Sequence, residues 1–541
     1  MYGFEHIGLY GELVSIAVDI RRGLPFVEIV GLPDSAIREA RERVRAAIRN
    51  AGFEFPLDRV LISLAPAGLK KSGAQFDLPI ALALLMASGQ LDMIPDTVIA
   101  VGELALSGTV LPVSGVLAAV ARAKQQGFHC VIIPEANKEE ASVIQGITII
   151  PMTHLRDAVT ICSSLSNIST TESDSSVQSL FGNLIASACN QTSVIFQQEQ
   201  TDYENSQNYS SKTDSFYNSF ICNFSSYRGQ PAVRRALEVA AAGNHHVLLA
   251  GPPGAGKTMA ARCLAGIIPE LDERTAFEAA ALYSLAGIPR GYSTARIVRI
   301  PHHSTSLEGL VGGGKTLKPG ELSLAHGGML FLDETLEFKN NVLQALREPL
   351  ETGVVTLSRA EKVVQYPARI LLVMAVNLCP CGNLGRKNGV CLCSSEELRR
   401  YWKKLSGPLL DRIDIRIPVQ SASADSFADH TPCEPTASIA KRVSACRTLQ
   451  SKRYRGWKTS VNGLLDSEGI ARFLKDDLDR HVSFTAMMEE KGLSSRGIIA
   501  VFKIARTLAD LELSPHIRTE HLDEAFSLRC QEAENWYWTS F

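Results

Sequence analysis

The sequence predicts an α/β protein of several domains, and three observations support this fold class. The chain has 541 residues, which at about 150 residues per domain suggests three or four domains. Strand-like and helix-like segments alternate through most of its length, as in folds built on parallel sheets. Near residue 250 a short apolar strand, a glycine-rich loop and a helix follow one another directly.

The composition is that of a globular protein, with 45% apolar and 21% charged residues. It excludes wholesale disorder, collagen and a small disulfide scaffold. The net charge of −2 excludes a uniformly basic DNA-coating protein, but not a motor with local basic patches. The longest apolar run, residues 78–87, is too short to span a membrane. With no signal peptide at the start, we expect a cytoplasmic protein with reduced or metal-bound cysteines.

The chain divides into four predicted segments. Residues 1–162 alternate strands (12–20, 60–64, 98–101 and 131–134) with helices, one capped by Asp34 or Ser35 and another over residues 115–126. Residues 163–222 are rich in Ser, Asn, Thr and Gln and are predicted to be a disordered polar linker. Residues 223–424 are again αβ. Residues 425–541 are predicted to be helical, over 441–455, 466–474, 494–513 and 519–530.

The strongest motif is a loop that matches the phosphate-binding pattern GxxxxGK[ST]. It consists of Gly251, Pro252, Pro253, Gly254, Ala255, Gly256, Lys257 and Thr258. A strand over residues 247–250 precedes it and a helix follows, which is the context that this loop requires. Its backbone N–H groups can surround phosphates, Lys257 can neutralise their charge and Thr258 can hold Mg²⁺. A glycine-rich turn without function is the weaker alternative.

Two further strands end in polar side chains. The strand at residues 329–332 is followed by Asp333, predicted to organise Mg²⁺, and Glu334, predicted to polarise the attacking water. Without the phosphate loop, this acidic pair could simply cap a helix. Asn377 follows a strand over residues 369–376 and could orient the water, although a strand-terminating Asn is often only a turn residue.

Two arginines downstream could stabilise charge on a transferring phosphoryl group. Arg412 follows a short helix in the stretch GPLLDRID, and Arg496 begins a helix in the stretch LSSRG. Either residue alone would more often form a surface salt bridge.

Together these motifs resemble an AAA+ ATPase of the magnesium-chelatase-like clade, and more narrowly the ComM/YifB family. The resemblance rests on GPPGAGKT, GGMLFLDE, GPLLDRID, the PHHS and CPCG stretches and LSSRGIIAVFKIARTLADL. It implies a P-loop AAA+ core with a helical lid and a ring, expected to be a hexamer, with ATP and Mg²⁺ between subunits. It also implies that Arg412 is a finger supplied in trans and that Arg496 is the lid sensor.

The same resemblance implies a helicase-type motor that moves branched or single-stranded DNA during recombination in natural transformation. Two departures bear on it. Where the family has Leu-Pro after the carboxylate pair, this chain has Thr335 and Leu336, and where it has Pro after the sensor Asn, this chain has Leu378. The carboxylates themselves are kept, so we expect hydrolysis to be retained.

Residues 98–134 resemble the proteolytic domain of Lon, a ribosomal S5-like αβ fold. Lon cleavage requires a Ser nucleophile activated by a Lys. Here the lysine position carries Leu117, and Lys70, Lys71 and Ser72 lie out of register with the nucleophile. The sequence therefore predicts a Lon-like domain that is not a protease.

Four cysteines form two CxC pairs, which are Cys379, Cys381, Cys391 and Cys393. Four thiolates can hold a tetrahedral Zn²⁺. CxC is a less typical zinc half-site than CxxC, so four reduced thiols in a loop remain the alternative.

Three features are candidates for DNA contact. Residues 283–320, with Lys315 and Lys318, lie where the clade that this chain resembles has an insertion in its second helix. Residues 354–367 are predicted to form a β-hairpin with Arg359 and Lys362 at its tip, where related ring motors face the pore. Residues 441–460 carry seven cations among Tyr454 and Trp457, which suits backbone contact and base stacking. A solvated helix face is the alternative for that basic segment. The adjacent His302 and His303 are predicted to be structural.

Three functions remain open from the sequence. The first is a DNA motor that drives branch migration or strand separation. The second is a chelatase-type motor that remodels a protein partner, against which the Lon-like domain argues. The third is a non-catalytic scaffold, against which the intact Lys257, Asp333 and Glu334 argue.

Overall fold

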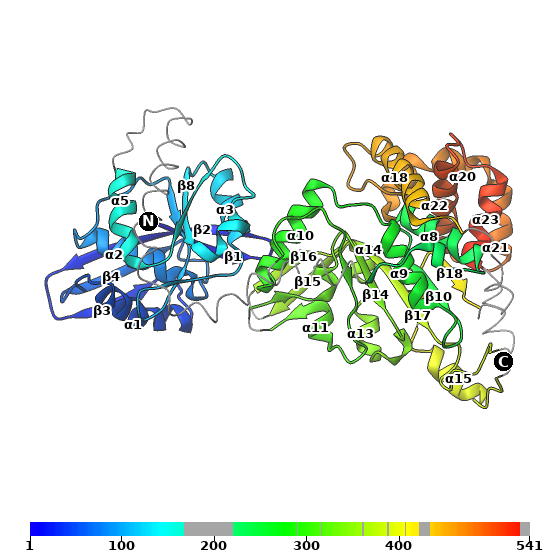
Figure 1. Ribbon diagram of the computed structural model, residues 1–541, viewed down its shortest axis with the longest axis horizontal. Coiled ribbons are helices and arrows are strands. Elements are labelled where there is room, and N and C mark those ends of the chain that lie inside the picture. Colours follow the sequence, from blue (N-terminus) through cyan, green and yellow to red (C-terminus); the bar gives the residue numbers. More distant parts are fainter. Residues whose placement is uncertain are drawn as a thin grey trace. The chain divides into compact units, whose positions relative to one another are not determined.

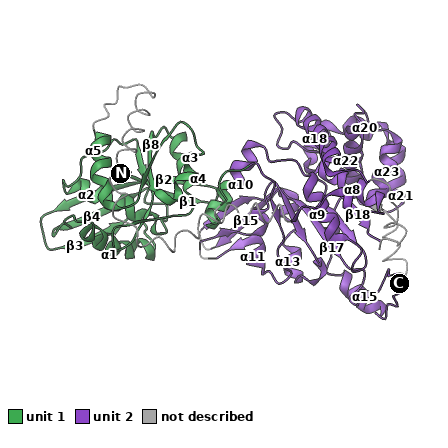
Figure 2. Cartoon of the chain, viewed as in Figure 1, with its two compact units in different colours: residues 1–213, 280–293 green, residues 214–279, 294–541 purple. Residues whose placement is uncertain are grey.

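The structure is a computed structural model, and it describes residues 1–166, 220–288, 290–314, 316–359, 362–386, 389–405, 407–420 and 433–530. The chain forms two compact units (Figure 2). Unit 1 comprises residues 1–213 and 280–293, and unit 2 comprises residues 214–279 and 294–541. The predicted linker lies mostly outside the described residues, as does the predicted boundary at residue 424. Helix α5 (Ala158–Ser166) continues past the predicted boundary at residue 162.

Unit 1 is built on a seven-stranded mixed sheet with the order β3-β4-β2-β1-β5-β8-β9 (Figure 1). Its strands are β1 (Tyr2–Ile7), β2 (Tyr10–Arg21), β3 (Phe26–Val30), β4 (Arg59–Ala65), β5 (Val98–Ala100), β8 (Cys130–Pro134) and β9 (Thr148–Met152). A separate two-stranded ribbon joins β6 (Glu103–Leu104) to β7 (Val110–Leu111). The strands predicted from the sequence are confirmed, with small shifts at their ends.

Helices cover both faces of this sheet. They are α1 (Ser35–Asn50), α2 (Asp77–Ala87), α3 (Val116–Gln125), α4 (Lys138–Ala141) and α5. Successive residues of β8 point to opposite faces, so that Ile132 packs with α1 and α2 while Val131 and Ile133 pack with α3. Asp34 caps α1 by accepting a hydrogen bond from the backbone N–H of Ile37, as the sequence predicted.

Unit 2 contains a five-stranded parallel sheet with the order β11-β14-β17-β10-β18. Its strands are β10 (Val247–Ala250), β11 (Val298–Arg299), β14 (Met329–Leu332), β17 (Leu371–Val376) and β18 (Ile415–Pro418). Their near-continuous apolar sequences fit a sheet that is covered on both faces. The order of the strands in the sheet differs from their order in the sequence, because β10 lies between β17 and β18, the two strands that are latest in sequence.

Short helices and ribbons surround this sheet. The helices are α8 (Pro231–Gly243), α9 (Lys257–Ile267), α11 (Leu307–Val311), α12 (Glu321–Leu324), α13 (Asn340–Gln344), α14 (Pro349–Thr352), α15 (Ser395–Trp402) and α16 (Gly407–Leu410). Helix α10 (Glu273–Ala286) begins in unit 2, and its residues 280–286 belong to unit 1. One ribbon pairs β12 (Gly312–Gly313) with β13 (Lys318–Pro319). The other is the predicted hairpin of β15 (Val354–Arg359) and β16 (Lys362–Pro367).

The C-terminal part of unit 2 is helical, as predicted. It contains α18 (Thr436–Arg453), α19 (Ser467–Phe473), α20 (Lys475–Arg480), α21 (Val482–Glu490), α22 (Ser495–Leu511) and α23 (Thr519–Cys530). Apolar residues of α18, α22 and α23 share one buried cluster with α8, α9 and one face of the sheet. No helix of the described residues is both long and apolar enough to cross a membrane.

A buried polar network ties this helical lid to the sheet. His245 contacts Asp414 through Nδ1 at 3.0 Å and the hydroxyl of Thr507 on α22 through Nε2 at 2.8 Å. Asn462 donates to the same hydroxyl at 3.0 Å and to Asp510 at 3.0 Å. Burial raises the pKa of Asp414, but the hydrogen bond with His245 and the electrostatic interactions with His245, His246 and Lys503 together lower it overall.

Thr507→Val tests this tie, because it removes the shared hydroxyl while keeping the shape of the side chain. His245 and Asn462 would each lose a partner in a buried position, which costs about 1–3 kcal/mol of stability. We expect the midpoint of urea denaturation to be lower, as measured by tryptophan fluorescence, to which Trp402 and Trp457 of unit 2 contribute. Thr448→Val, on the exposed side of α18, is the control and should leave the midpoint unchanged.

Candidate functional site

The candidate nucleotide site lies where three neighbouring strands of unit 2 end. Ala250 of β10 pairs in register with Val376 of β17, and Leu332 of β14 pairs with Met374. The residues that follow these strands therefore meet at one edge of the sheet. They are the phosphate loop, the carboxylate pair and Asn377, which the sequence analysis singled out separately.

The phosphate loop connects β10 to the N-terminus of α9. Gly254 and Gly256 have φ angles of 79° and 95°, a left-handed conformation that favours glycine. Gly251 is required for another reason, because a β-carbon there would lie 2.1 Å from the carbonyl oxygen of Val419. The loop thus has the glycines that its backbone path demands.

Lys257 is turned into this loop and is 9% exposed. Its Nζ donates to the carbonyl oxygens of Gly251 at 2.8 Å and Pro252 at 2.9 Å, and to Oδ1 of Asn377 at 3.0 Å. Burial lowers the pKa of Lys257, and the nearby carboxylates of Asp333 and Glu334 oppose that shift. The structure thereby brings Lys257 and Asn377 into direct contact.

Thr258 and Asp333 are also joined, since the Thr258 hydroxyl donates to Oδ2 of Asp333 at 2.9 Å. A hydroxyl and a carboxylate in contact are oxygen donors of the kind that Mg²⁺ prefers. The donor set therefore fits a Mg²⁺ ion that is bound together with phosphates. The other Asp333 oxygen accepts the backbone N–H of Glu334 at 2.9 Å, which fixes the carboxylate.

Glu334 has a left-handed backbone, with φ 47° and ψ 46°, and its side chain is 56% exposed. Such a conformation is unfavourable for a residue other than glycine and is concentrated at functional sites. Nδ1 of His303 lies 3.9 Å from Oε2 of Glu334. His303 was predicted to be structural, but its ring lies beside the predicted catalytic carboxylate.

The departure at Thr335 and Leu336 is accommodated locally. Thr335 is fully buried and its hydroxyl donates to the carbonyl oxygen of Leu332 at 2.8 Å. Because the buried hydroxyl has an acceptor, it adds little energetic cost. The two carboxylates before it lie at the end of β14.

The two candidate arginines share one acidic partner. Arg412 and Arg496 both form salt bridges with the carboxylate of Glu351, the latter at 2.8 Å. Their side chains are 14% and 45% exposed. Arg529 of α23 donates to the carbonyl oxygen of Ile413 at 2.8 Å and so holds the segment that carries Arg412 against the lid. Glu351 was not identified from the sequence.

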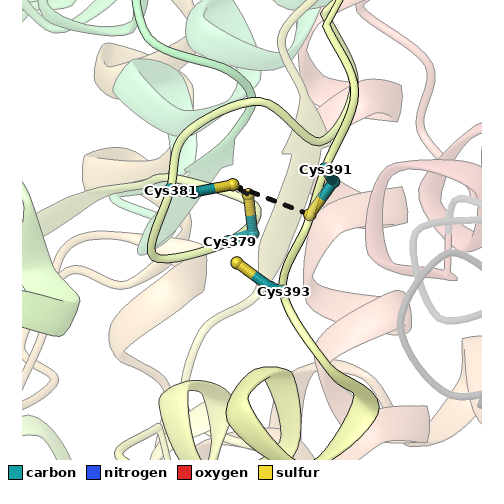
Figure 3. Close-up of side chains that lie close together, drawn as sticks. All are labelled: Cys379, Cys381, Cys391 and Cys393. Atoms are coloured by element: carbon teal, nitrogen blue, oxygen red, sulfur yellow. Dashed lines mark hydrogen bonds between the residues drawn. The ribbon is translucent and has the colours of Figure 1, made fainter.

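The four cysteines converge in one loop after β17 (Figure 3). Their sulfur atoms all lie within 4.8 Å of one another. The Sγ atoms of Cys379 and Cys381 are 3.3 Å apart, and those of Cys381 and Cys391 are 3.7 Å apart. A backbone hydrogen bond at Asn383 lowers the pKa of Cys381 to about 6. Cys393 belongs to the same group, directly before α15.

The predicted hairpin is confirmed, with Arg359 paired to Lys362 at its end. Val355, Leu357, Val364 and Tyr366 point inward, and the Tyr366 hydroxyl donates to the carbonyl oxygen of Leu317 at 2.8 Å. Arg359 is exposed and Lys362 is partly exposed. The hairpin is therefore anchored on one face and cationic at its tip.

The basic segment 441–460 is different from the DNA-stacking surface considered above. Arg442 pairs with Glu238 and Glu434, Arg453 with Asp510, and Lys458 with Asp466 and Glu468, while Arg447 donates to the carbonyl oxygen of Ala241. Tyr454 is buried and Trp457 packs edge-on against Phe473. These side chains tie helices together, and only Lys441, Lys452 and Arg455 of the seven cations stand exposed without a partner described here.

The Lon-like residues of unit 1 do not form a hydrolytic pair. Lys71 is buried and its Nζ donates to the carbonyl oxygens of Gly31, Leu64 and Pro66. An ammonium group that donates its three hydrogen bonds to carbonyl oxygens is not positioned to act as a general base. The Ser72 hydroxyl donates to Glu5 at 2.7 Å, and Leu117 is buried in α3.

Comparison with known proteins agrees with this geometry. Three family models match: subunit ChlI of Mg-chelatase over residues 16–137, magnesium chelatase subunit ChlI over residues 223–427, and its C-terminal region over residues 433–529. The uncharacterized protein YifB of Escherichia coli is 37% identical over 528 residues, which cover 97% of this chain and 95% of YifB. Competence protein ComM of Haemophilus influenzae is 36% identical over 537 residues, covering 98% and 97%.

A weaker match concerns Lon protease of Mycolicibacterium smegmatis, 25% identical over 169 residues, or 29% of this chain and 21% of Lon. The fold and the site define the class: unit 2 is an AAA+ P-loop core with a helical lid. The chain belongs to the ComM/YifB family of magnesium-chelatase-like proteins.

Glu334→Gln tests the role of the exposed carboxylate. A missing general base should lower ATP hydrolysis by about 10²-fold or more, while the unchanged phosphate loop keeps nucleotide binding. Phosphate release and the binding of a fluorescent ATP analogue measure the two properties separately. Glu337→Gln, an exposed carboxylate in the next turn, is the control. Full hydrolysis by Glu334→Gln would exclude this residue as the base.

Proposed function

We propose that this protein is an ATP-driven ring motor that acts on DNA and catalyses branch migration or strand separation in homologous recombination during natural transformation. One observation carries the proposal. Lys257, Thr258, Asp333, Glu334 and Asn377 meet at one sheet edge in a chain that aligns over nearly its full length with a competence protein. We also propose that the protein acts in the cytoplasm.

The chain's own residues would carry out hydrolysis as follows. Lys257 would exchange its contacts with the loop carbonyls for the β- and γ-phosphates of ATP. Thr258 and Asp333 would hold Mg²⁺, which neutralises phosphate charge when bound. Glu334 would accept a proton from the attacking water, and Asn377, freed from Lys257, would orient that water beside the γ-phosphate.

The proposed ring, a homo-hexamer, gives the arginines their task. Arg412 and Arg496 share Glu351 and therefore lie side by side, whereas Lys257 is engaged with its own loop and Asn377. We propose that both guanidinium groups reach the γ-phosphate bound by a neighbouring subunit. Glu351 would hold them in that orientation until phosphate replaces its carboxylate.

The hairpin supplies the proposed DNA contact. Its inner face is anchored in unit 2 while Arg359 and Lys362 extend at its end. Cations on a rigid support suit phosphate contact without sequence readout. Single-stranded or branched DNA is therefore the proposed partner.

A chelatase-type motor that remodels a protein partner is the second candidate, and the matches to magnesium chelatase subunit ChlI favour it. The two functions differ in what stimulates hydrolysis. DNA should accelerate the DNA motor, while a chelatase-type motor should be indifferent to it.

We also propose that Cys379, Cys381, Cys391 and Cys393 bind one Zn²⁺. Four thiolates at about 2.3 Å from a tetrahedral zinc lie about 3.8 Å from one another. The observed separations of 3.3 Å and 3.7 Å are close to this value. The donor set and its spacing thus fit zinc.

The first experiment follows ATP hydrolysis together with strand release from labelled forked and four-way DNA, with Lys257→Ala as the inactive control. Hydrolysis that DNA stimulates, with strand release that requires Lys257, supports the motor. Robust hydrolysis that ignores every DNA offered would overturn it and favour a protein client.

Arg359→Ala and Lys362→Ala test the hairpin. Each variant should hydrolyse ATP but release less strand per ATP, because a backbone contact is lost at the tip. Each should also reduce, by about one, the slope of the logarithm of DNA affinity against the logarithm of salt concentration. Gln365→Ala, an exposed uncharged residue of the same hairpin, is the matched control. If both cationic variants unwind DNA like the control, the hairpin is not the contact.

Glu351→Gln tests the shared carboxylate. Because Glu351 is half exposed, the loss of its ion pairs should shift the protein concentration at half-maximal hydrolysis by only about two- to fivefold, toward lower values. Activity measured over a dilution series gives this midpoint. Glu396→Gln removes a more exposed carboxylate, which is paired with Arg400, and should not move this midpoint. A midpoint that rises would mean that Glu351 supports the arginines rather than competing with phosphate.

A further inference from the structure

The cysteine loop is not an isolated metal loop, because it lies directly against the phosphate loop. A β-carbon at Gly382 would lie 2.9 Å from Cγ of Pro253, and one at Gly385 would lie 3.6 Å from Cδ of Pro252. Both glycines have left-handed φ angles, 73° and 80°. The backbone between the two CxC pairs is thus close-packed on the two prolines that shape the nucleotide loop.

The same loop begins at the sensor residue. Asn377 accepts the hydrogen bond of Lys257 and is followed by Leu378 and Cys379, which are both buried. Cys379 Sγ also accepts the backbone N–H of Leu384 at 3.3 Å, so this sulfur organises the turn that reaches Pro252. The first CxC pair therefore lies within a few bonds of the catalytic edge.

The second pair is anchored to a helix. Ser394 follows Cys393 and caps α15 in a reciprocal capping box with Glu397. At the other end of α15, Trp402 donates from Nε1 to the carbonyl oxygen of Leu378 at 3.1 Å. This hydrogen bond joins the two ends of the segment from Leu378 to Trp402. Within this segment, the gap between the two cysteine pairs is the part that remains to be joined.

We propose that zinc bound by the four cysteines joins the two pairs and thereby braces the phosphate loop, so that metal occupancy sets nucleotide affinity. The inference rests on the proposed zinc site, but not on any action on DNA. Binding converts four thiols to thiolates with release of their protons to solvent and involves no change of oxidation state. Without the metal, Cys381 and Cys391, which are not buried, are joined by a weak thiol contact of 3.7 Å, and residues 382–386 would separate from Pro252 and Pro253.

The test uses the full-length protein and two measurements that need neither hydrolysis nor DNA. These are zinc content by mass spectrometry and the dissociation constant of a fluorescent ADP analogue. Cys381→Ser should lose the zinc and bind the analogue about tenfold more weakly, since small misplacements of binding groups have large effects. Cys433→Ser, a partly exposed cysteine elsewhere in unit 2, should retain both properties.

A second variant separates the brace from the metal. Gly382→Ala should keep its zinc yet bind the ADP analogue more weakly, because the added methyl group would clash with Pro253. Gly127→Ala introduces the same left-handed strain, at φ 81° with no atom within 4 Å, and should change neither measurement. Removal of zinc from the wild type with a chelator, followed by its return, should weaken and then restore binding, which keeps the test informative if Cys381→Ser fails to fold.

The outcomes are distinct. One zinc per chain, with affinity that falls on chelation and in Gly382→Ala, supports the brace. Zinc that can be removed without any change in affinity overturns the brace but leaves the zinc site standing. Wild-type protein purified without zinc, and unable to take it up, overturns both.

Discussion

The parallel pairing of β14, β17 and β10 is the constraint on which the rest of unit 2 depends. Parallel strands place their carboxyl ends at a common edge, so three segments that are far apart in sequence deliver their polar residues to one place. Each of those residues then contacts another: Lys257 with Asn377, and Thr258 with Asp333. A shift of one residue in either register would turn these side chains away and disassemble the site.

A second layer of dependence joins the lid to that sheet. Asp414 follows Arg412 by two residues and is held by His245. His245 also contacts Thr507 on α22, the helix that carries Arg496 in its first turn. The backbone around Arg412 is further held by Arg529 of α23. The positions of both arginines are therefore set by the packing of the lid against the core, and a movement of the lid would displace both side chains.

The sequence predicted the parts that are local. The phosphate loop, the carboxylate pair, the hairpin and the two CxC pairs are each written in a short stretch, and the structure has each where it was expected. Residues whose significance depends on strand order were missed. His303 follows β11, which neighbours β14 in space but not in sequence, and Glu351 acquires its meaning only when Arg412 and Arg496 reach it. The basic segment 441–460 was misleading, because its acidic partners lie on other helices.

Glu351 also affects what an unassembled subunit presents to solvent. A bare pair of guanidinium groups would attract any polyanion from a distance of about one Debye length, about 8 Å at physiological ionic strength. With the carboxylate between them, Arg412 and Arg496 present a partly compensated surface instead. In the proposed ring, the phosphate of a nucleotide would replace the Glu351 carboxylate as the partner of the two arginines once it is in contact with them. Nucleic acid would bind only weakly to this face of a free subunit.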